Sequence, residues 1–292
     1  MSSETTEIRL AGITTVRTVH ALRTQLRRWR QDGDMLALVP TMGALHAGHL
    51  ALVRHARGLA ERVCVSLFVN PTQFGPNEDF AVYSRDEEGD AEKLRDLGAD
   101  LLFAPAVEEM YPPDALTRVT VPSLGDMLEG EHRPGFFTGV ATVVGKLLLQ
   151  ALPDIAVFGE KDYQQLLVVR RLCADLWIPT RIEGAPTVRE PDGLALSSRN
   201  AYLTADERQI APALHRTLRE VAEGVLVEGA DPIERAAWGE AELLRAGFDA
   251  VDYVEVRDAE TLVPWPGPSR PGRVLAAARL GRTRLIDNVP IA

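Results

Sequence analysis

Two histidines, His46 and His49, stand three residues apart beside two glycines, Gly43 and Gly48. An apolar run at residues 35–39 precedes them and an amphipathic stretch follows, so the pattern predicts a strand, a small-residue turn and a helix. The first N–H groups of a helix have no partner within it, which makes a helix start a binding place for anions. Residues three apart share one helix face, and both imidazoles can therefore donate to the same phosphate. The turn indicates a nucleotide site at which the reaction takes place at phosphorus.

Two other interpretations of this turn are weaker. A lone histidine at a helix start more often caps the helix or faces solvent, and it is the pair beside glycines that favours a ligand site. A metal site at His46 and His49 needs a third ligand. The sequence has neither a His-Glu-x-x-His pattern nor a further ligand close by.

Polar segments also follow two other apolar runs. Residues 68–74 carry Gln73, whose amide can donate to and accept from a small polar ligand. Residues 158–165 carry Lys161, a cation near the next helix start, and Gln165, which is expected to face the same cleft. Taken alone, the first segment is equally typical of a solvated loop and the second of a charged turn.

A fourth segment, residues 196–200, supplies two hydroxyls and a guanidinium from Ser197, Ser198 and Arg199. The planar fork of an arginine suits the oxygens of a triphosphate. The sequence contains no Gly-x-Ser-x-Gly, no Walker A motif and no cysteine paired with a histidine. A reaction without a protein nucleophile fits these residues. In the activation of a carboxylate by ATP, the substrate itself attacks the α-phosphorus while the enzyme positions it and stabilises charge.

The composition of the 292-residue chain is that of an ordinary globular protein, with 46% hydrophobic and 25% charged residues. The formal net charge of −10 argues against binding to nucleic acid or to an anionic membrane. Cys64 and Cys173 lie in apolar segments and are expected to be buried free thiols in a reducing compartment. The polar N-terminus predicts no signal peptide, and Lys146 interrupts the longest apolar stretch, residues 140–152. We therefore expect a soluble cytoplasmic protein.

Short apolar runs alternate with amphipathic stretches over the first two thirds of the chain. The expected strands are residues 36–39, 63–69, 101–103 and 155–158. The expected helices are residues 20–30, 50–61, 87–97, 138–152 and 164–176. This alternation predicts an α/β fold, a Rossmann-like doubly wound parallel sheet that binds ligands at the carboxyl ends of its strands.

The pattern changes after residue 187. A capping box at residues 204–207 predicts a long helix that reaches about Gly224. A second helix at residues 232–246 is followed by three short strands, which predict an antiparallel sheet at residues 253–257, 274–278 and 283–286. We therefore expect a Rossmann-like domain at residues 1–187, a smaller α+β domain at residues 188–292, and the site in the cleft between them.

Residues 39–50 closely resemble the nucleotide-binding motif of the pantothenate synthetase family, within the adenylate-forming superfamily that has a His-x-Gly-His turn. Residues 68–74, 159–165 and 196–200 are similar to other signatures of this family, in the same order and over most of the chain. The resemblance implies the ATP-dependent condensation of (R)-pantoate with β-alanine. The expected intermediate is a pantoyl-adenylate, and the expected products are pantothenate, AMP and pyrophosphate.

The resemblance also implies roles for single residues. Expected to bind ATP are Met42, Gly43, Ala44, Leu45, His46, Ala47, Gly48, His49, Gly159, Glu160, Lys161, Asp162, Val188, Leu196, Ser197, Ser198 and Arg199. His49 is expected to be a catalytic proton donor, while His46 and Lys161 act at the phosphates. Gln73 and Gln165 are expected to hold pantoate, with Gln73 also near β-alanine. An apolar wall for the methyl groups of pantoate is expected from Val140, Val143 and Val144.

Magnesium and a second copy of the chain are further implications of the resemblance. The acidic stretch at residues 86–90 matches the magnesium carboxylates of the family incompletely, and Asp90 is the candidate ligand. A solvated first helical turn explains the acids there equally well. The family also implies a homodimer with small-molecule substrates.

Two positions depart from the pattern of the family. Phe136 stands where the family often has histidine, and Ser84 replaces the usual proline within residues 83–85. Two rival functions remain open at this point. One is a nucleotidylyltransferase of the same fold, which would need a basic cluster for a phosphorylated acceptor. The other is a nucleotide-binding sensor without chemistry, against which the retained His46, His49, Lys161 and Arg199 argue.

Overall fold

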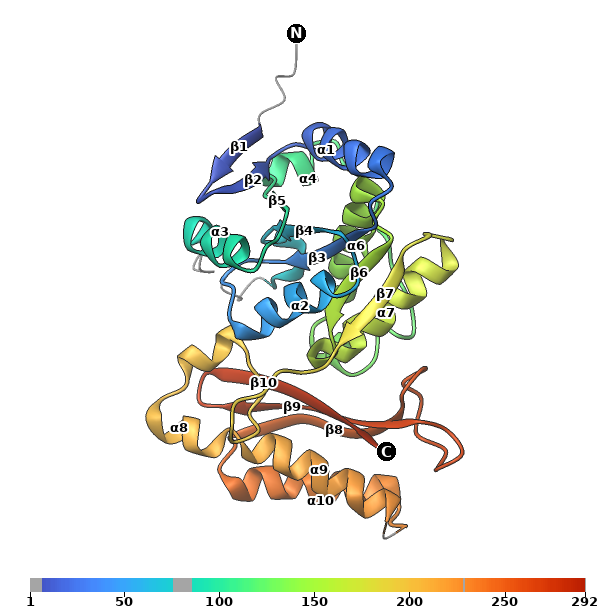
Figure 1. Cartoon of the computed structure of the whole chain (residues 1–292). Coiled ribbons are helices and arrows are strands. Elements are labelled where there is room, and N and C mark those ends of the chain that lie inside the picture. Colours follow the sequence, from blue (N-terminus) through green and yellow to red (C-terminus); the bar gives the residue numbers. More distant parts are fainter. Residues whose placement is uncertain (1–6, 76–85, 228, 292) are drawn as a thin grey trace.

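Two separate β-sheets organise the chain in a computed structural model, which describes residues 7–75, 86–227 and 229–291 (Figure 1). A seven-stranded sheet has the order β1-β2-β5-β4-β3-β6-β7, and a three-stranded sheet has the order β10-β9-β8. The first sheet contains β1 (Glu7–Leu10), β2 (Ile13–Val16), β3 (Leu36–Thr41), β4 (Arg62–Leu67), β5 (Leu101–Phe103), β6 (Ile155–Gly159) and β7 (Arg181–Ala185). Its strands from β2 to β7 pair in parallel, which confirms the predicted α/β class.

Helices cover both faces of the parallel sheet. The helices are α1 (Val19–Asp32), α2 (Ala47–Arg57), α3 (Glu87–Asp96), α6 (Phe136–Ala151) and α7 (Tyr163–Asp175), with the short α4 (Val107–Met110) and α5 (Glu129–His132) between β5 and α6. Leu36 and Leu38 of β3 join a core cluster with α1, α6 and α7, whereas Ala37 and Val39 join the cluster formed with α2 and α3. Alternate residues of β3 thus face opposite layers, which explains why this strand is apolar throughout.

The sequence did not predict three strands of the first sheet, and their positions explain why. β1 and β2 form an antiparallel hairpin at one edge, and β7 lies at the other edge. The residues of β1 and four of the five residues of β7 are exposed or half-buried, so neither strand shows an apolar run. β2 is mostly buried, but with only four residues it is too short for a clear pattern.

The C-terminal part packs two helices against the antiparallel sheet of β8 (Ala250–Asp258), β9 (Gly272–Leu280) and β10 (Thr283–Ile291). The predicted single helix up to Gly224 is wrong. The chain forms α8 (Ala205–Ile210) and α9 (Ala213–Leu226), separated at Pro212, because a proline inside a helix lacks an N–H and clashes with the preceding turn. α10 (Pro232–Ala246) and the capping box of Thr204 with Glu207 are as expected.

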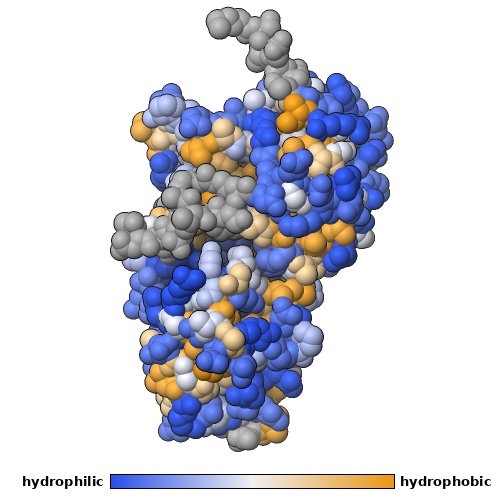
Figure 2. Space-filling model, turned by 90° about the vertical axis from the view of Figure 1, so that its left-hand side faces the viewer, coloured by the Kyte–Doolittle hydropathy of each residue, from blue (hydrophilic) through white to orange (hydrophobic). Residues whose placement is uncertain are grey.

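The face of the molecule in Figure 2 is largely hydrophilic, with apolar residues in separate patches. Within the described residues, no helix has the length and apolar character needed to cross a membrane. Both cysteines are buried and unpaired, as the sequence predicts.

The carboxyl ends of three adjacent strands carry the segments with candidate site residues. The turn that holds the histidines follows β3, the short helix η1 (Pro71–Gln73) follows β4, and η2 (Glu160–Asp162) follows β6. Parallel pairing brings these three ends to one edge of the sheet. Three segments that are far apart in the sequence therefore lie close together in the fold.

Gly139 in α6 is expected to be essential for the close packing of this helix on η1. A Cβ atom at Gly139 would lie 2.4 Å from the carbonyl oxygen of Thr72, whereas a Cβ atom at Gly145 of the same helix would meet no atom closer than 3.7 Å. We expect Gly139→Ala to lower the free energy of unfolding by about 1–3 kcal/mol through overpacking. Gly145→Ala, the matched control, should be neutral or stabilising by up to about 1 kcal/mol. Denaturant unfolding measures both, and equal stability of the two variants would contradict the proposed close approach.

Candidate active site

The turn after β3 is shaped by two consecutive residues with positive φ. Gly43 has φ 88° and Ala44 has φ 52°, so the chain reverses sharply before α2 begins. α2 starts at Ala47, three residues earlier than the sequence predicts, with His46 as its N-cap. Both histidines consequently belong to the first turn, where the unpaired N–H groups of the helix lie.

The two imidazoles cap this helix reciprocally. Nδ1 of His46 accepts a hydrogen bond of 3.1 Å from the backbone N–H of Gly48, and Nδ1 of His49 accepts one of 3.4 Å from the backbone N–H of His46. The ring centroids are 4.1 Å apart. Because each Nδ1 is an acceptor, the hydrogen of each neutral ring is on Nε2. Both rings therefore carry an Nε2–H donor for a ligand.

Both histidines are held in the neutral form. Burial, followed by the charge of the neighbouring His46, lowers the pKa of His49 from its usual value of 6.5 to about 4. Burial is also the main cause that lowers the pKa of His46, followed by the positive charge of Lys161. At neutral pH the pair therefore donates hydrogen bonds without carrying a fixed positive charge.

Asp90 of α3 holds the backbone of the histidine turn at Leu45. Its carboxylate is buried, and Oδ1 accepts from the backbone N–H of Leu45 at 2.9 Å and from Nζ of Lys93 at 3.2 Å. Lys93 also donates to the carbonyl oxygen of Leu45 at 3.0 Å. The side chain of Leu45 is itself buried in the core, so only its backbone is available to a ligand.

A magnesium site at Asp90 stays a prediction. Within the described residues, no group of three or more histidine, cysteine, aspartate or glutamate side chains is placed to hold a metal. Mg²⁺ at nucleotide sites commonly needs only one or two carboxylates, because phosphate and water complete its shell. Oδ2 of Asp90 lies 3.4 Å from the place of a Cβ on Gly43, and thus at the histidine turn. Oδ2 of Asp90 is therefore the carboxylate oxygen that a metal held mainly by phosphate would use.

Gln73 is oriented by Asn70, a residue that the sequence did not single out. Nδ2 of Asn70 donates to Oε1 of Gln73 at 2.8 Å and to the carbonyl oxygen of Gly139 at 3.2 Å. Oδ1 of Asn70 accepts from the hydroxyl of Tyr111 at 3.0 Å. With Oε1 engaged in this way, the Nε2 group of Gln73 is the donor that can meet a substrate oxygen.

Arg133 is a second residue at this site that the sequence did not identify. Its Nη2 donates to the backbone carbonyl of Gln73 at 3.0 Å, and its Nη1 lies 3.4 Å from Oε1 of Glu129. Its guanidinium stacks on the ring of Phe136, with 3.9 Å to the ring centroid. Phe136 thus supports Arg133 by a cation–π contact in place of the polar contact that a histidine would make.

Glu129 of α5 also links this part of the chain to the C-terminal sheet. Its carboxylate pairs at 2.7 Å with Arg284 of β10, and Arg284 is held in turn by Asp252 at 2.6 Å. Gln164 is a structural residue here, because its amide bonds the backbone of residues 124, 127 and 129. Gln165, the candidate pantoate ligand, is half-buried in the first turn of α7.

Residues of the third and fourth sequence segments meet in one place. Lys161 of η2 lines a small cavity together with Ser197 and Arg199, and residues 284–287 of β10 close it. Ser197 caps the short helix η3 (Ser198–Tyr202) by accepting from the N–H of Arg199 at 3.2 Å. The structure therefore brings these candidate ATP ligands together, although about forty residues separate them in the sequence.

The fourth segment also reaches the histidine turn. A Cβ atom on Gly48 would lie 3.6 Å from Cβ of Leu196, so Leu196 packs over the first turn of α2. The N–H of Leu196 donates at 2.9 Å to the carbonyl of Val188, which places these two candidate residues side by side. Val140, Val143 and Val144 are buried in the core cluster that contains Phe68 and Phe158. Residues 83–85, with the departure at Ser84, lie outside the described residues.

Known proteins match nearly the whole chain. The family model described as pantoate-beta-alanine ligase matches residues 14–290. The pantothenate synthetase of Paramagnetospirillum magneticum is 60% identical over 276 residues, which make up 94% of this chain and 97% of that protein. The chain belongs to the pantoate–β-alanine ligase family.

Solved structures agree with this family assignment. The crystal structure of the pantothenate synthetase of Thermus thermophilus matches with a TM-score of 0.88 at 48% identity, covering 95% of this chain and 99% of that one. The ligase of Francisella tularensis, complexed with beta-gamma ATP and beta-alanine, matches with a TM-score of 0.79 at 33% identity, covering 95% and 97%. The predicted family and ligase class are thus confirmed, and the rival nucleotidylyltransferase is not favoured.

The ligase should show the low pKa of His49 in its pH-dependent stability. Between about pH 4 and 6.5, the unfolded chain binds a proton at this residue that the folded chain excludes, so the free energy of unfolding rises with pH. We expect His49→Gln to flatten this rise by up to about 3 kcal/mol. Denaturant unfolding at several pH values measures the slope, and NMR of the imidazole signals measures the pKa. His55→Gln in the same helix is the matched control, and a His49 signal that titrates near pH 6.5 would refute the prediction.

Proposed function

We propose that the ligase activates (R)-pantoate with ATP at the junction of the two sheets, and that β-alanine then takes over the pantoyl group. The observation that carries this proposal is the shared cavity of Lys161, Ser197 and Arg199, next to the contact of Leu196 with Gly48. We assign residues 1–187 to a domain that binds ATP and pantoate, and residues 188–292 to a lid. The ATP-bound Francisella relative supports ATP as the substrate.

In the first half-reaction, a carboxylate oxygen of pantoate attacks the α-phosphorus of ATP and pyrophosphate leaves. We assign ATP binding to residues 42–49, 159–162 and 196–199 together with Val188. The Nε2–H groups of His46 and His49 donate to phosphate oxygens, while Lys161 and Arg199 offset negative charge on the α-phosphate and the leaving pyrophosphate. A phosphate beside His49 raises its pKa again, because a nearby negative charge favours imidazolium. His49 therefore becomes a proton donor only when ATP is bound.

In the second half-reaction, the neutral amine of β-alanine attacks the acyl carbon of the pantoyl-adenylate, AMP leaves, and the amine proton passes to the AMP phosphate or to water. We assign the pantoate oxygens to the amides of Gln73 and Gln165. The Nε2 group of Gln73 is aimed by Asn70, and its backbone is held by Arg133. Val140, Val143 and Val144 provide the apolar wall for the methyl groups.

We further propose that Asp90 and the phosphates of ATP hold Mg²⁺, and that the ligase is a cytoplasmic homodimer. When bound, Mg²⁺ neutralises phosphate charge. The acidic net charge agrees with partners that are small molecules and not nucleic acid or membranes. Light scattering after size-exclusion chromatography tests the dimer.

Replacement of His49 tests the proposed adenylation site. We expect His49→Ala to slow single-turnover formation of pantoyl-adenylate by about 10²–10³-fold, because one phosphate donor is lost. Rapid quench with labelled ATP measures this rate. Wild-type enzyme should release pyrophosphate with pantoate alone, before β-alanine is added.

The matched control for this experiment is His55→Ala in the same helix, which should retain the wild-type rate. His55 lies 3.5 Å from Glu183 and outside the reciprocal cap. An unchanged rate in His49→Ala would exclude the assigned role. Pyrophosphate release that requires a phosphorylated acceptor in place of pantoate would favour a nucleotidylyltransferase.

Replacement of Asp90 separates a metal ligand from a structural carboxylate. Asp90→Asn keeps an acceptor for the N–H of Leu45 but removes the charge. If Asp90 binds Mg²⁺, the Mg²⁺ concentration for half-maximal adenylation should rise by about tenfold or more. A titration of activity with Mg²⁺ measures this shift. An unchanged Mg²⁺ dependence would show that Asp90 serves only the turn.

A further inference from the structure

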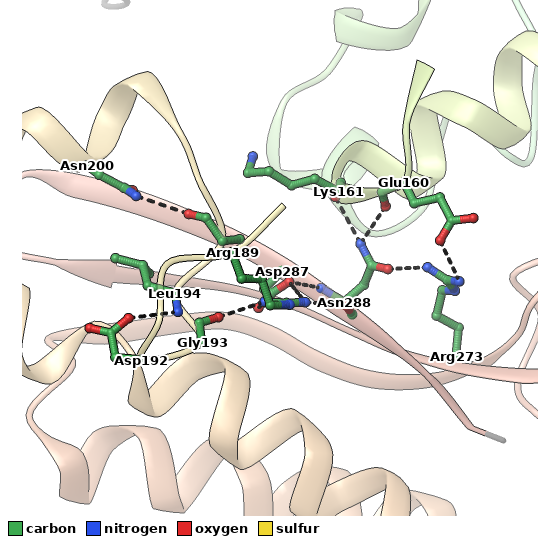
Figure 3. A network of polar contacts seen from close by, with 11 residues as sticks. Glu160, Lys161, Arg189, Asp192, Gly193, Leu194, Asn200, Arg273, Asp287 and Asn288 are labelled. Atoms are coloured by element: carbon green, nitrogen blue, oxygen red, sulfur yellow. Dashed lines mark hydrogen bonds and ion pairs between the residues drawn. The ribbon is translucent and has the colours of Figure 1, made fainter. Parts of the chain in front are cut away.

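A single buried asparagine of the C-terminal sheet holds the turn that carries Lys161. Nδ2 of Asn288 in β10 donates to the carbonyl oxygens of Glu160 at 3.0 Å and Lys161 at 2.9 Å (Figure 3). The carbonyls are consecutive and belong to η2, a helix of three residues. Both donors of one amide are thus used to fix the two peptide groups that precede and follow the Cα atom of Lys161.

The amide of Asn288 is itself locked in this orientation. Its Oδ1 accepts a hydrogen bond from Arg273, whose guanidinium stacks on Tyr163 at 3.6 Å from the ring centroid and lies 3.5 Å from Glu160. Its backbone N–H donates to Oδ1 of Asp287 at 2.7 Å. Because Arg273 can only donate, the oxygen of the amide must face it and the Nδ2 group must face η2.

The same strand contributes to the cavity in which Lys161 meets Arg199. Residues 284–287 of β10 line this cavity, and Asp287 is bound by Arg189 at 2.6 and 2.9 Å (Figure 3). A lysine ammonium sits on a flexible four-carbon stem, so its location depends on where the backbone places the root of that stem. Anchoring η2 on β10 therefore sets the place of Lys161 relative to the ligands that come from residues 197–199.

We propose that Asn288 is a positioning residue for adenylation, which acts by fixing Lys161 to the C-terminal sheet. This inference rests on the proposed role of Lys161 at the phosphates of ATP. Asn288 bonds the backbone of Lys161 to β10, although η2 is continuous with β6 of the first sheet. A displacement of about 1 Å at a reacting group can cost about 100-fold in rate, which gives this anchoring a measurable effect.

The competing explanation is that Asn288 only helps to hold the two parts of the chain together. Tyr163 offers a control for this explanation. The hydroxyl of Tyr163 donates to the carbonyl of Ala259 at 2.8 Å, which is also a contact between the two parts of the chain. Tyr163→Phe removes this hydrogen bond but keeps the ring under Arg273 and the backbone of Lys161 in place. If only the contact between the two parts matters, Tyr163→Phe and the Asn288 variants should slow adenylation to the same extent.

The test compares Asn288→Asp and Asn288→Ala with Tyr163→Phe in single-turnover adenylation. Asn288→Asp keeps the shape and the acceptor for Arg273 but turns an acceptor toward the two carbonyls. We expect both Asn288 variants to lower the rate constant by about 10- to 100-fold, with the KM for pantoate changed less than about twofold. Tyr163→Phe should stay within about twofold of wild type. Circular dichroism confirms folding, and the isosteric Asn288→Asp keeps the test decisive if Asn288→Ala unfolds.

A double-mutant cycle with Lys161→Met shows whether Asn288 acts through Lys161. We expect Lys161→Met alone to slow adenylation, and the addition of Asn288→Asp to slow it no further. If the two effects multiply, or if Tyr163→Phe is as slow as the Asn288 variants, the positioning role is refuted. If Lys161→Met leaves the rate unchanged, the proposed function of Lys161 itself fails. Failure of the positioning role and failure of the proposed role of Lys161 therefore give different results.

Discussion

The unpaired N–H groups at the start of α2 are the constraint around which the site is built. A helix start next to a buried strand must satisfy these donors, and here two histidine rings do so reciprocally. This use of Nδ1 sets the tautomer of both rings, and burial keeps both neutral. The buried carboxylate of Asp90 then holds the turn that precedes the helix. The two side chains that cap the helix are thus the same two that we propose as phosphate donors.

Two polar contacts join β10 to the N-terminal part of the chain, and each lies at a different half of the candidate site. Arg284 pairs with Glu129, which neighbours Arg133 and hence the backbone of Gln73 on the side assigned to pantoate. Asn288 bonds the turn of Lys161 on the side assigned to ATP. β10 carries both contacts, four residues apart, so one strand of the small sheet bonds both sides of the proposed site. An apolar interface would hold the two parts together but would not fix the positions of Glu129 and of the Lys161 turn relative to β10.

The sequence predicted that the segments with histidine, lysine and glutamine follow apolar strands, and the structure places three of these segments at the carboxyl ends of adjacent strands. It also predicted the central strands β3, β4 and β6, whose two buried faces make them apolar. It did not predict β1 and β7, which are edge strands with polar faces. It also predicted one helix across Pro212, because the capping box was given more weight than the proline. Asn70, Arg133 and Asn288 could not be found in this way. Their partners are set by tertiary contacts, and Asn288 lies 127 residues from Lys161.

Phe136 has a consequence for how the two halves of the site respond to acidity. Its ring supports Arg133, which bonds the backbone of Gln73, and neither a phenyl ring nor a guanidinium changes its charge near neutral pH. A histidine at this position would titrate in that range and would repel the arginine once it was protonated. The contact between Phe136 and Arg133 is therefore independent of pH, whereas the imidazoles at the helix start take up protons in acid. With phenylalanine at this position, acid does not introduce a positive charge beside Arg133.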